Sequence, residues 1–366
     1  MADLLVSVGT RSAAVTAAAV VEAAARRNLR CVVVAAGPHC RLEQKRSFDV
    51  ELGLTRSDVA GAEHDAAIAA RIADAFESEL TRIDPKLVVS AGDDSAAPVC
   101  AQAARRRHYR VARLDGGLRS GTQLVDEVSR KHCDHLSTYL YASGTTEVEN
   151  LVAEGCRREQ VERVGSLVCA AALAHGPAGA SDGVREEERP CLVTVSRCET
   201  IDDYEPLRRV VEAVVVVSRC VPVVFPMDDQ TRRRLEEFGL DRVIENEAGL
   251  RTCGAVDYAE FGSLLASSRL VLTDSGVVEE EAAARGISCL ALRDATERTT
   301  AASLGSNGVV GTQTEPILEE ALSVLEGTPR PHAIPELWDG LAGERVVSSL
   351  SAHLEEPVST GAHASA

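Results

Sequence analysis

Short apolar runs alternate with alanine-rich, helix-length segments along this chain, and the alternation stops once and then begins again. Continuous apolar runs separated by helices are typical of buried strands in a parallel sheet. The first half is therefore predicted to be a doubly wound α/β domain. Its predicted strands are Leu4–Val8, Cys31–Ala35, Leu87–Ser90, Val111–Leu114 and Leu136–Tyr141, and its predicted helices are Ser12–Arg27, Glu63–Ile83 and Ala96–Arg107.

A second unit of the same kind follows a linker-like segment, His175–Arg189, which is rich in Gly, Ala, Ser and acidic residues. We predict two Rossmann-like domains, 1–175 and 190–342, with the ligand between them at the carboxyl ends of the strands. A last helix, Gly343–Leu354, is expected to pack back on the first domain, and the tail 357–366 is too small and polar to fold alone. The predicted strands of the second domain are Cys191–Val195, Val221–Phe225, Leu270–Thr273 and Ser288–Leu292, and its predicted helices are Tyr204–Ser218, Asp229–Phe238, Tyr258–Ser267, Val277–Arg285 and Glu315–Leu325.

The composition limits the partners of the protein. A net charge of −17 disfavours binding to nucleic acid or to an anionic membrane. No apolar run approaches the ~20 residues that span a bilayer, and the N-terminal sequence lacks an export signal, so we expect a cytoplasmic protein. The 11 cysteines show no CxxC spacing, which favours reduced thiols over disulfides or zinc. The chain has no GxGxxG motif and no metal-ligand cluster, so nothing in its residues calls for a nicotinamide cofactor or a metal.

Two strand-to-helix turns have the features of a phosphate site. Gly9-Thr10-Arg11 follows the first predicted strand, and Asp274-Ser275-Gly276 follows Leu270–Thr273. Free N–H groups at a helix N-terminus and a forked guanidinium both suit a diphosphate. A carboxylate one turn into the second helix can accept from the hydroxyls of a ribose. An ordinary turn and an N-capped acidic helix explain the same residues without a ligand.

Carboxylates lie at three places in the first domain: Asp93-Asp94, Asp115 and Asp126-Glu127. If they converge, they can perform general acid–base chemistry, provided that their surroundings separate their pKa values. Each one alone is also a common turn residue. The segment Arg293–Arg298 carries more charge than a turn requires, which suggests a loop in the cleft, and a surface cluster of ion pairs is the alternative.

These segments, in this order, resemble the non-hydrolysing UDP-N-acetylglucosamine 2-epimerases over essentially the whole chain. The resemblance implies two Rossmann-like domains facing across a cleft, as in the glycosyltransferase-B fold, a homodimer, and a UDP-amino sugar (UDP-GlcNAc or a derivative) as the ligand. The segments that carry it are Val8 to Arg11, Gly92-Asp93, Asp115 to Gly121, Asp126-Glu127 with Arg130, Arg197 with Glu199, Thr273 to Gly276 with Glu280 to Ala282, and Arg293-Asp294 with Thr296 to Arg298.

The chemistry that the resemblance implies is an anti elimination of UDP to a 2-acetamidoglucal, followed by addition of UDP to the other face. A base must remove the proton at C2, and the leaving diphosphate must be stabilised. The residues expected to act in catalysis are Asp93, Asp115, Asp126, Glu127 and Ser196. Those expected to bind the substrate are Arg11, Arg119, Arg130, Arg197, Ser275, Gly276, Glu281 and Arg298.

The chain departs from the family pattern mainly on the side of the sugar. Ser196 cannot act as an acid or base near neutral pH as the family histidine can. Asp115 replaces a glutamate, and withdrawing a carboxylate by about 1 Å can cost roughly a hundredfold in rate. The other departures are Ser12, Ala13 and Thr16 in place of proline, glutamate and lysine, and Asp228 in place of a second histidine.

Several functions therefore stay open at this point. The first is a UDP-N-acetylglucosamine 2-epimerase or a close variant of it. The second is a hydrolysing epimerase, in which water attack releases UDP and a free N-acetylmannosamine-type sugar. The third is a catalytically impaired UDP-sugar-binding protein, which the missing histidine and lysine favour. A glycosyltransferase rests on the fold alone.

One prediction concerns regulation by a second UDP-sugar, which bacterial members of the family bind with a Gln-His segment after the second strand. This chain has Gly37-Pro38-His39-Cys40 there, without the glutamine and with a proline that stiffens the loop. We therefore expect no activation by added UDP-GlcNAc, and a hyperbolic dependence of the initial rate on its concentration checks this. A sigmoidal curve, with reverse turnover that requires a trace of UDP-GlcNAc, would contradict the prediction.

Overall fold

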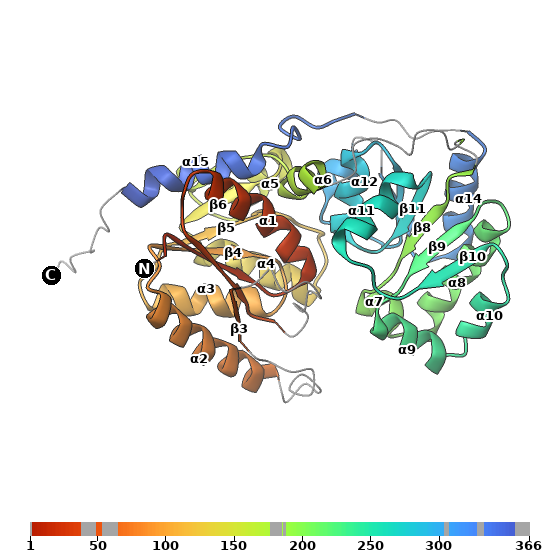
Figure 1. The fold of residues 1–366 in the computed structure, drawn as a ribbon, viewed down its shortest axis with the longest axis horizontal. Helices are drawn as coiled ribbons and strands as arrows, with labels where there is room; N and C mark the ends of the chain where they lie inside the picture. Colours follow the sequence, from red (N-terminus) through yellow and green to blue (C-terminus); the bar gives the residue numbers. More distant parts are fainter. Residues whose placement is uncertain are drawn as a thin grey trace.

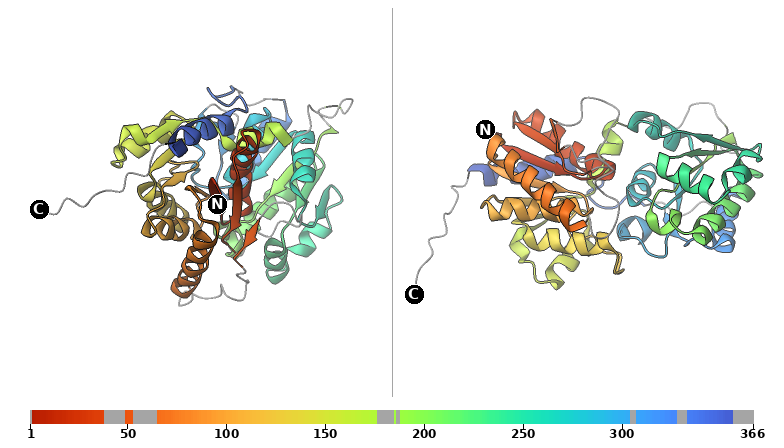
Figure 2. Two further views of the ribbon diagram at one scale, coloured as in Figure 1. Left: turned by 60° about the vertical axis from the view of Figure 1, so that its left-hand side comes forward. Right: turned by 90° about the horizontal axis from the view of Figure 1, so that it is seen from below.

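The computed structural model describes residues 2–37, 49–52, 65–175, 185, 188–303, 307–327 and 333–355. Within them the chain forms two sheets of parallel strands, which lie side by side, each with its own helices (Figures 1 and 2). Residues 38–40 of the predicted regulatory loop, most of the predicted linker and the predicted tail lie outside the described residues, and the domain limits at 175 and 190 stay a prediction.

The first sheet has seven strands in the order β3-β2-β1-β4-β5-β6-β7. Leu4, Val6 and Val8 of β1 pack in one core with helices α1 and α6, while Leu5 packs in another core with α2 and α3. Because both faces are covered, the central strands are apolar throughout. The elements are β1 (Leu4–Val8), α1 (Arg11–Arg26), β2 (Cys31–Ala35), β3 (Val50–Glu51), α2 (Asp65–Ile83), β4 (Leu87–Ala91), α3 (Ala96–Arg106), β5 (Val111–Arg113), α4 (Val125–Leu136), β6 (Tyr139–Ala142), α5 (Thr145–Ala153), a 3-10 turn (Arg158–Gln160), β7 (Val161–Arg163) and α6 (Leu167–His175).

The second sheet has six strands in the order β10-β9-β8-β11-β12-β13. Both sheets thus show the doubly wound order that the sequence predicts, and the predicted fold class is confirmed. The elements are β8 (Cys191–Thr194), α7 (Cys198–Ile201), α8 (Tyr204–Ser218), β9 (Val223–Pro226), α9 (Asp229–Glu237), α10 (Asp241–Glu245), β10 (Leu250–Cys253), α11 (Tyr258–Ser267), β11 (Leu270–Thr273), α12 (Gly276–Ala284), β12 (Ser288–Ala291), α13 (Thr299–Ser303), β13 (Asn307–Val309) and α14 (Thr314–Leu325).

The last helix, α15 (Ala342–Glu355), leaves the second half of the chain and lies on the first sheet beside α1 (Figure 1). Its apolar residues Ala342, Val346, Val347 and Leu350 are fully buried in the same core as β1. Polar contacts fix it as well, since the Tyr141 hydroxyl donates to Ser349 Oγ over 3.1 Å. The core of the first sheet is therefore completed by residues from the other end of the chain.

Two sequence predictions of local structure need correction. The segment Leu136–Tyr141 is not one strand, because Leu136 ends α4 and β6 begins only at Tyr139. The Ser137 hydroxyl donates to the carbonyl of Cys133 over 2.7 Å, which closes the helix and turns the chain into the strand. The strands β3, β7, β10 and β13 were not predicted, because each forms the edge of a sheet and is short or partly polar.

Candidate active site

The carboxyl ends of both sheets lead into the charged residues that the sequence singles out. In a doubly wound sheet, ligands bind outside the strand ends at the point where the strand order reverses. In the first sheet this point lies between β1 and β4, which lead into Gly9 and Asp93. In the second it lies between β8 and β11, which lead into Ser196 and Asp274. Ion pairs between the two halves bring these ends together.

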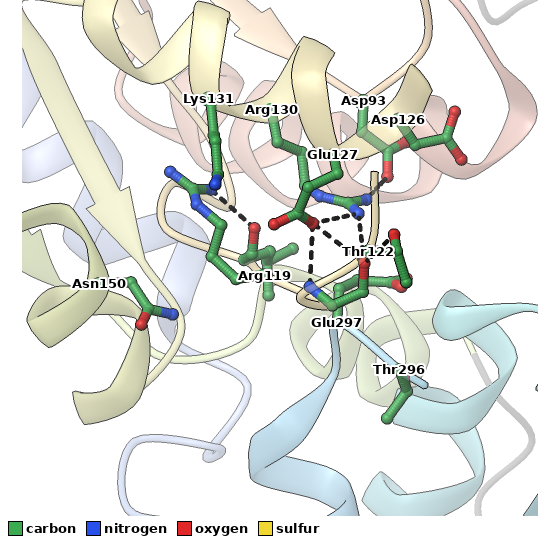
Figure 3. A network of polar contacts seen from close by, with 12 residues as sticks. Asp93, Arg119, Thr122, Asp126, Glu127, Arg130, Lys131, Asn150, Thr296 and Glu297 are labelled. Atoms are coloured by element: carbon green, nitrogen blue, oxygen red, sulfur yellow. Dashed lines mark hydrogen bonds and ion pairs between the residues drawn. The ribbon is translucent and has the colours of Figure 1, made fainter. Parts of the chain in front are cut away.

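Arg130, from α4, is the centre of the first charged group (Figure 3). It is almost fully buried, and its guanidinium binds Asp93 Oδ2 at 2.6 Å and Glu127 Oε2 at 3.0 Å. The backbone N–H and the hydroxyl of Ser120 also donate to Glu127, at 2.9 and 3.0 Å. Burial opposes ionisation, but these donors outweigh it and hold the pKa of Glu127 below its usual value. Glu127 is thus suited to hold Arg130 and not to give up a proton.

Asp126, the neighbour of Glu127, forms the first bridge between the halves. Its Oδ2 binds the guanidinium of Arg197, which follows β8 of the second sheet, at 2.6 Å. Burial raises the pKa of Asp126 and the nearby Asp93 carboxylate adds to this, although Arg197 opposes both. Of the two adjacent carboxyl groups, Asp126, with its raised pKa, is the one suited to carry a proton.

Asp115 lies in a second charged group, and its backbone has a left-handed conformation with φ of +53°. This conformation is unfavourable for a residue other than glycine and marks a position where the surroundings dictate the geometry. Its Oδ2 accepts from the hydroxyl of Thr16 at 3.3 Å and from the guanidinium of Arg298 at 3.2 Å. Arg298 belongs to the second half of the chain, so this contact is a further bridge.

Arg298 also binds Glu280 Oε1 at 3.2 Å, and both side chains are buried. The other oxygen of Glu280 accepts from the hydroxyl of Ser166, at the start of α6, over 2.8 Å. One buried guanidinium therefore joins carboxylates from α12 and from the loop after β5. The charged loop after β12 lies at the junction of the halves, as the excess of charge in its sequence suggests.

The two predicted phosphate turns begin α1 and α12. Arg11 is exposed in the first turn of α1, whose N-cap, Thr10, accepts from the Ala13 N–H at 3.1 Å. Ser275 is the N-cap residue of α12, and its side chain makes no capping bond. A Cβ on Gly276 would lie 2.2 Å from an oxygen of Glu297, so any larger residue here would displace that carboxylate. The N-terminus of α12 thus has no side-chain cap, and the first turn of α1 presents an exposed guanidinium; both features suit an anion.

Glu281, the predicted ribose ligand, lies in α12 and is buried. Its Oε1 accepts from the hydroxyl of Tyr258, the first residue of α11, over 2.6 Å. Burial raises the pKa of Glu281, while Tyr258 and Arg285 oppose the shift. The carboxylate is held by a side chain that leaves its other oxygen available to a hydroxyl group.

A family model described as UDP-N-acetylglucosamine 2-epimerase matches residues 21–351 of this chain. The chain belongs to the UDP-N-acetylglucosamine 2-epimerase family. The UDP-N-acetylglucosamine 2-epimerase of Methanocaldococcus jannaschii is 27% identical over 363 residues, which cover 95% of this chain and 98% of that protein. The UDP-2,3-diacetamido-2,3-dideoxy-D-glucuronate 2-epimerase of Pseudomonas aeruginosa is 29% identical over 89% of this chain and 93% of its own length. The family predicted from the motifs is confirmed.

Solved structures of family members share the fold. The Methanocaldococcus jannaschii UDP-GlcNAc 2-epimerase in complex with UDP-GlcNAc and UDP superposes with a TM-score of 0.84 at 25% identity, and covers 95% of this chain and 99% of that one. The S. aureus MnaA–UDP structure gives a TM-score of 0.82 at 21% identity over 98% of this chain and 99% of that one. The two-domain arrangement is thus common to the family.

Two of the predicted site residues of this family member have other contacts. Arg119 binds Asp134 at 2.7 Å and Glu154 at 2.5 Å, so its guanidinium is engaged within the first domain. Ser196 is exposed, and its backbone N–H donates to both carboxylate oxygens of Asp274, at 3.0 and 3.2 Å. Substrate binding by Arg119 and catalysis by Ser196 stay predictions, with no contact to either charged group in their favour.

Asp134 was not named from the sequence, and Asp94 and Glu280 were named only beside other residues and not as site residues, although the structure places all three close to the site. Asp94 lies against the first phosphate turn, since a Cβ on Gly9 would be 2.1 Å from its Oδ1. Glu280 was quoted only as part of the family motif. A signal for both was present, because each is an acidic residue directly beside a predicted site residue. Asp134 had no such signal, as it lies in the last turn of α4, a helix that was not predicted.

The stability of the protein is expected to depend on pH through Asp94. Burial raises the pKa of Asp94 to about 6 and Asp93 adds to the shift, whereas the Ala96 N–H and Arg113 oppose it. The folded state therefore binds this proton more tightly than the unfolded state, and the free energy of unfolding falls as pH rises from about 4 to 6. In Asp94→Asn the free energy of unfolding should decrease by roughly 2 kcal/mol less between about pH 4 and 6 than in wild type, as measured by urea unfolding across that range. Parallel pH profiles for the wild type and Asp94→Asn would contradict the assignment.

No group of three or more His, Cys, Asp or Glu side chains within the described part of the chain is arranged to hold a metal ion. Among the helices that the structure describes, none has the length and the apolar character needed to cross a membrane.

Proposed function

We propose that this chain epimerises C2 of a UDP-amino sugar, UDP-GlcNAc or a close derivative, by eliminating UDP and adding it back to the other face. The observation that carries the proposal is the meeting of carboxylates from the first domain with arginines from the second, Asp126 with Arg197 and Asp115 with Arg298. The family membership and the UDP-GlcNAc and UDP bound to a family member of known structure support it.

The nucleotide is assigned to the second sheet and the first turn of α1. The N-terminus of α12 at Gly276, the side chain of Ser275 and the exposed guanidinium of Arg11 provide hydrogen-bond donors and positive potential for a diphosphate. Glu281 provides the acceptor for the ribose. The same positive groups stabilise the charge that grows on the leaving diphosphate when the bond to C1 breaks.

The sugar is assigned to the two charged groups. In the elimination, a base takes the C2 proton, the electrons of that bond form the C1–C2 double bond, and UDP leaves with the electrons of the C1–O bond. The return step needs a proton for the opposite face of C2, so two carrier groups are required. Asp115 and Asp126 lie in different charged groups and on different elements, and Asp126 has the raised pKa that suits a proton donor. Asp93 and Glu127 hold Arg130 between them.

A hydrolysing reaction is the second candidate, and the missing histidine and lysine, which are the main support for an impaired binding protein, are compatible with it as well. Ser196 stands where the family has an imidazole, and Thr16, in place of a lysine, only donates a hydrogen bond to Asp115. With fewer cations to retain UDP after the elimination, water has more time to attack the glycal. The impaired binding protein is the outcome if neither reaction occurs.

Proton NMR of the protein with UDP-GlcNAc in D₂O distinguishes the three functions. Deuterium at C2 with UDP still attached to the sugar supports epimerisation. Accumulation of free UDP and free sugar shows hydrolysis. Binding without exchange and without UDP release shows a binding protein and contradicts both catalytic proposals.

The assignment of Glu281 to the ribose gives a binding prediction. Glu281→Ala should weaken UDP binding by at least ~1.5 kcal/mol in calorimetry, because a charge-assisted hydrogen bond is lost. Tyr258→Phe is the matched control, since it removes the hydroxyl that binds Glu281 but keeps the carboxylate, and its effect should be smaller. Equal UDP affinity of the wild type and Glu281→Ala would refute the assignment.

We also propose that the protein acts in the cytoplasm as a homodimer. Membership of the UDP-N-acetylglucosamine 2-epimerase family supports this proposal.

A further inference from the structure

Arg113 is a buried arginine that none of the proposed steps uses. It lies on β5, in the middle of the first sheet, and its side chain is only 1% exposed. A buried cation is costly unless it is paired, so its presence inside a sheet of Val, Ala and Leu calls for a physical reason. The reason is found in its two partners, which lie on different elements.

The guanidinium of Arg113 connects two turns at the carboxyl end of the sheet, one directly and one through Asp134. Its Nη1 donates to the carbonyl of Gly92, in the turn after β4. Its Nε lies 3.6 Å from Oδ1 of Asp134, an equally buried residue of α4. The other oxygen of Asp134 accepts from the N–H of Gly117, in the turn after β5, at 3.1 Å. The Arg113–Asp134 pair therefore links the two turns through buried, charged contacts.

Both turns have backbone conformations that need such support. Gly92 has φ of +96° and Gly117 has φ of +83°, values that suit glycine alone. A Cβ on Gly117 would lie 2.2 Å from the carbonyl oxygen of Glu147, so the turn is also packed closely against α5. Asp93 directly follows the first turn, and Asp115 directly precedes the double glycine of the second. The positions of the Asp93 and Asp115 carboxylates therefore depend on the two turns that Arg113 and Asp134 connect.

We propose that Arg113 and Asp134 form a positioning pair, which sets the placement of Asp93 and Asp115 relative to each other without touching the substrate. The inference rests on the proposed function, because it assigns the pair a role in the reaction of that same site. The pair acts on the sugar side only, since the nucleotide groups of α12 belong to the other sheet. Turnover should therefore depend on the pair, and UDP binding should not.

The guanidinium is better suited to this role than an ammonium group. A planar fork can donate to a carbonyl with one nitrogen and face a carboxylate with another, whereas a lysine is a point charge on a flexible stem. Arg113→Lys keeps the buried charge but cannot reproduce both contacts. It should recover part of the turnover that is lost in Arg113→Met, whose side chain fills the same space without charge.

The experiment measures kcat, KM and the dissociation constants of UDP and UDP-GlcNAc for Arg113→Met, Arg113→Lys and Asp134→Asn. We expect kcat to fall about a hundredfold in Arg113→Met and Asp134→Asn, as for a misplacement of about 1 Å, with UDP affinity within roughly threefold of wild type. Arg110→Met is the matched control, because Arg110 precedes the same strand and also donates to a backbone carbonyl, that of His353 in α15. It should lower the melting temperature but leave kcat within about threefold of the wild-type value.

The double variant Arg113→Met/Asp134→Asn separates positioning from stability. In Arg113→Met the buried Asp134 loses one of its two cations and keeps Arg119, whereas in the double variant Arg119 keeps Glu154 as its partner. The double variant should therefore be more stable than Arg113→Met. Its kcat should be no lower than that of Arg113→Met, because the two residues act as one unit. A double variant that regains turnover together with stability would overturn the inference. The same holds if kcat in Arg113→Met falls no more than in Arg110→Met, or if UDP affinity falls in parallel with kcat.

Failure of the proposed function is recognised separately. If wild type shows neither C2 exchange nor UDP release, the proposed reaction is refuted. The positioning role of Arg113 and Asp134 is then tested by ligand binding alone. Wild type should bind UDP-GlcNAc with a different affinity from UDP, and Arg113→Met should abolish that difference while UDP binding is retained. A difference that persists unchanged in Arg113→Met would overturn the positioning pair even then.

Discussion

Asp115→Asn and Asp126→Asn are each expected to lower the turnover of UDP-GlcNAc at least a hundredfold, within the usual range for losing a general acid or base. An amide keeps the shape of the carboxyl group but cannot carry a proton at C2. UDP affinity should stay nearly unchanged, because both residues belong to the first domain and the proposed nucleotide groups lie mainly in the second. Steady-state kinetics with calorimetry of UDP binding checks both parts.

The chain offers a close control for Asp115→Asn. Asp84 also has a left-handed backbone, with φ of +48°, but it precedes β4 and so lies at the opposite end of the same sheet. Asp84→Asn should leave turnover unchanged. If both site variants turn over UDP-GlcNAc as fast as wild type, the carboxylate mechanism fails, and Ser196, Arg197 and Asp228 become the next candidates.

Arg298→Met is expected to have the largest effect on stability, about 3 to 5 kcal/mol at neutral pH, because it leaves buried carboxylates without their cation. The affected groups are Asp115 and Glu280, at 7% and 2% exposure. Burial already raises the pKa of Glu280 while Arg298 opposes it. Without Arg298 that pKa rises further, so the variant should regain stability as pH falls and Glu280 takes up a proton.

Urea unfolding of Arg298→Met at neutral and mildly acidic pH measures this loss and its recovery. Arg234→Met is the control, since Arg234 pairs with Asp202 and Glu237 at the surface, where such pairs contribute about 1 kcal/mol or less. A loss in Arg298→Met no larger than in Arg234→Met would show that the interdomain pairing does not stabilise the fold.

The nucleotide half of the candidate site could be predicted from sequence because its groups are local. Ser275 and Gly276 follow β11 at once, and Arg11 is the first residue of α1. A strand end, a turn glycine and a helix start are visible in a few consecutive residues, and the fold class follows from the same periodicity. The parallel edge strands escaped prediction because a strand paired on one side only needs no continuous apolar run.

The pairings on the sugar side could not be predicted, because they join residues that are distant in the chain. Asp115 and Arg298 are separated by 183 residues. Asp126 and Glu127 look equivalent in sequence, yet they point to different parts of the structure, since consecutive helical residues lie about 100° apart. One faces Arg197 of the other domain and the other faces Arg130 and Ser120, and only this difference separates their pKa values.

Because α15 is made last, the core of the first sheet can be completed only after the second sheet has been synthesised. Leu4, Val6 and Val8 emerge from the ribosome first, but the helix that covers them, Ala342–Glu355, emerges only after the entire second sheet. At the usual pace of translation, residues 164–341 take roughly 10 to 35 seconds to make. All described strands and helices of the second sheet emerge before α15, so the second half can fold first. The first half keeps part of its apolar core open to chaperones or to other nascent chains until the end.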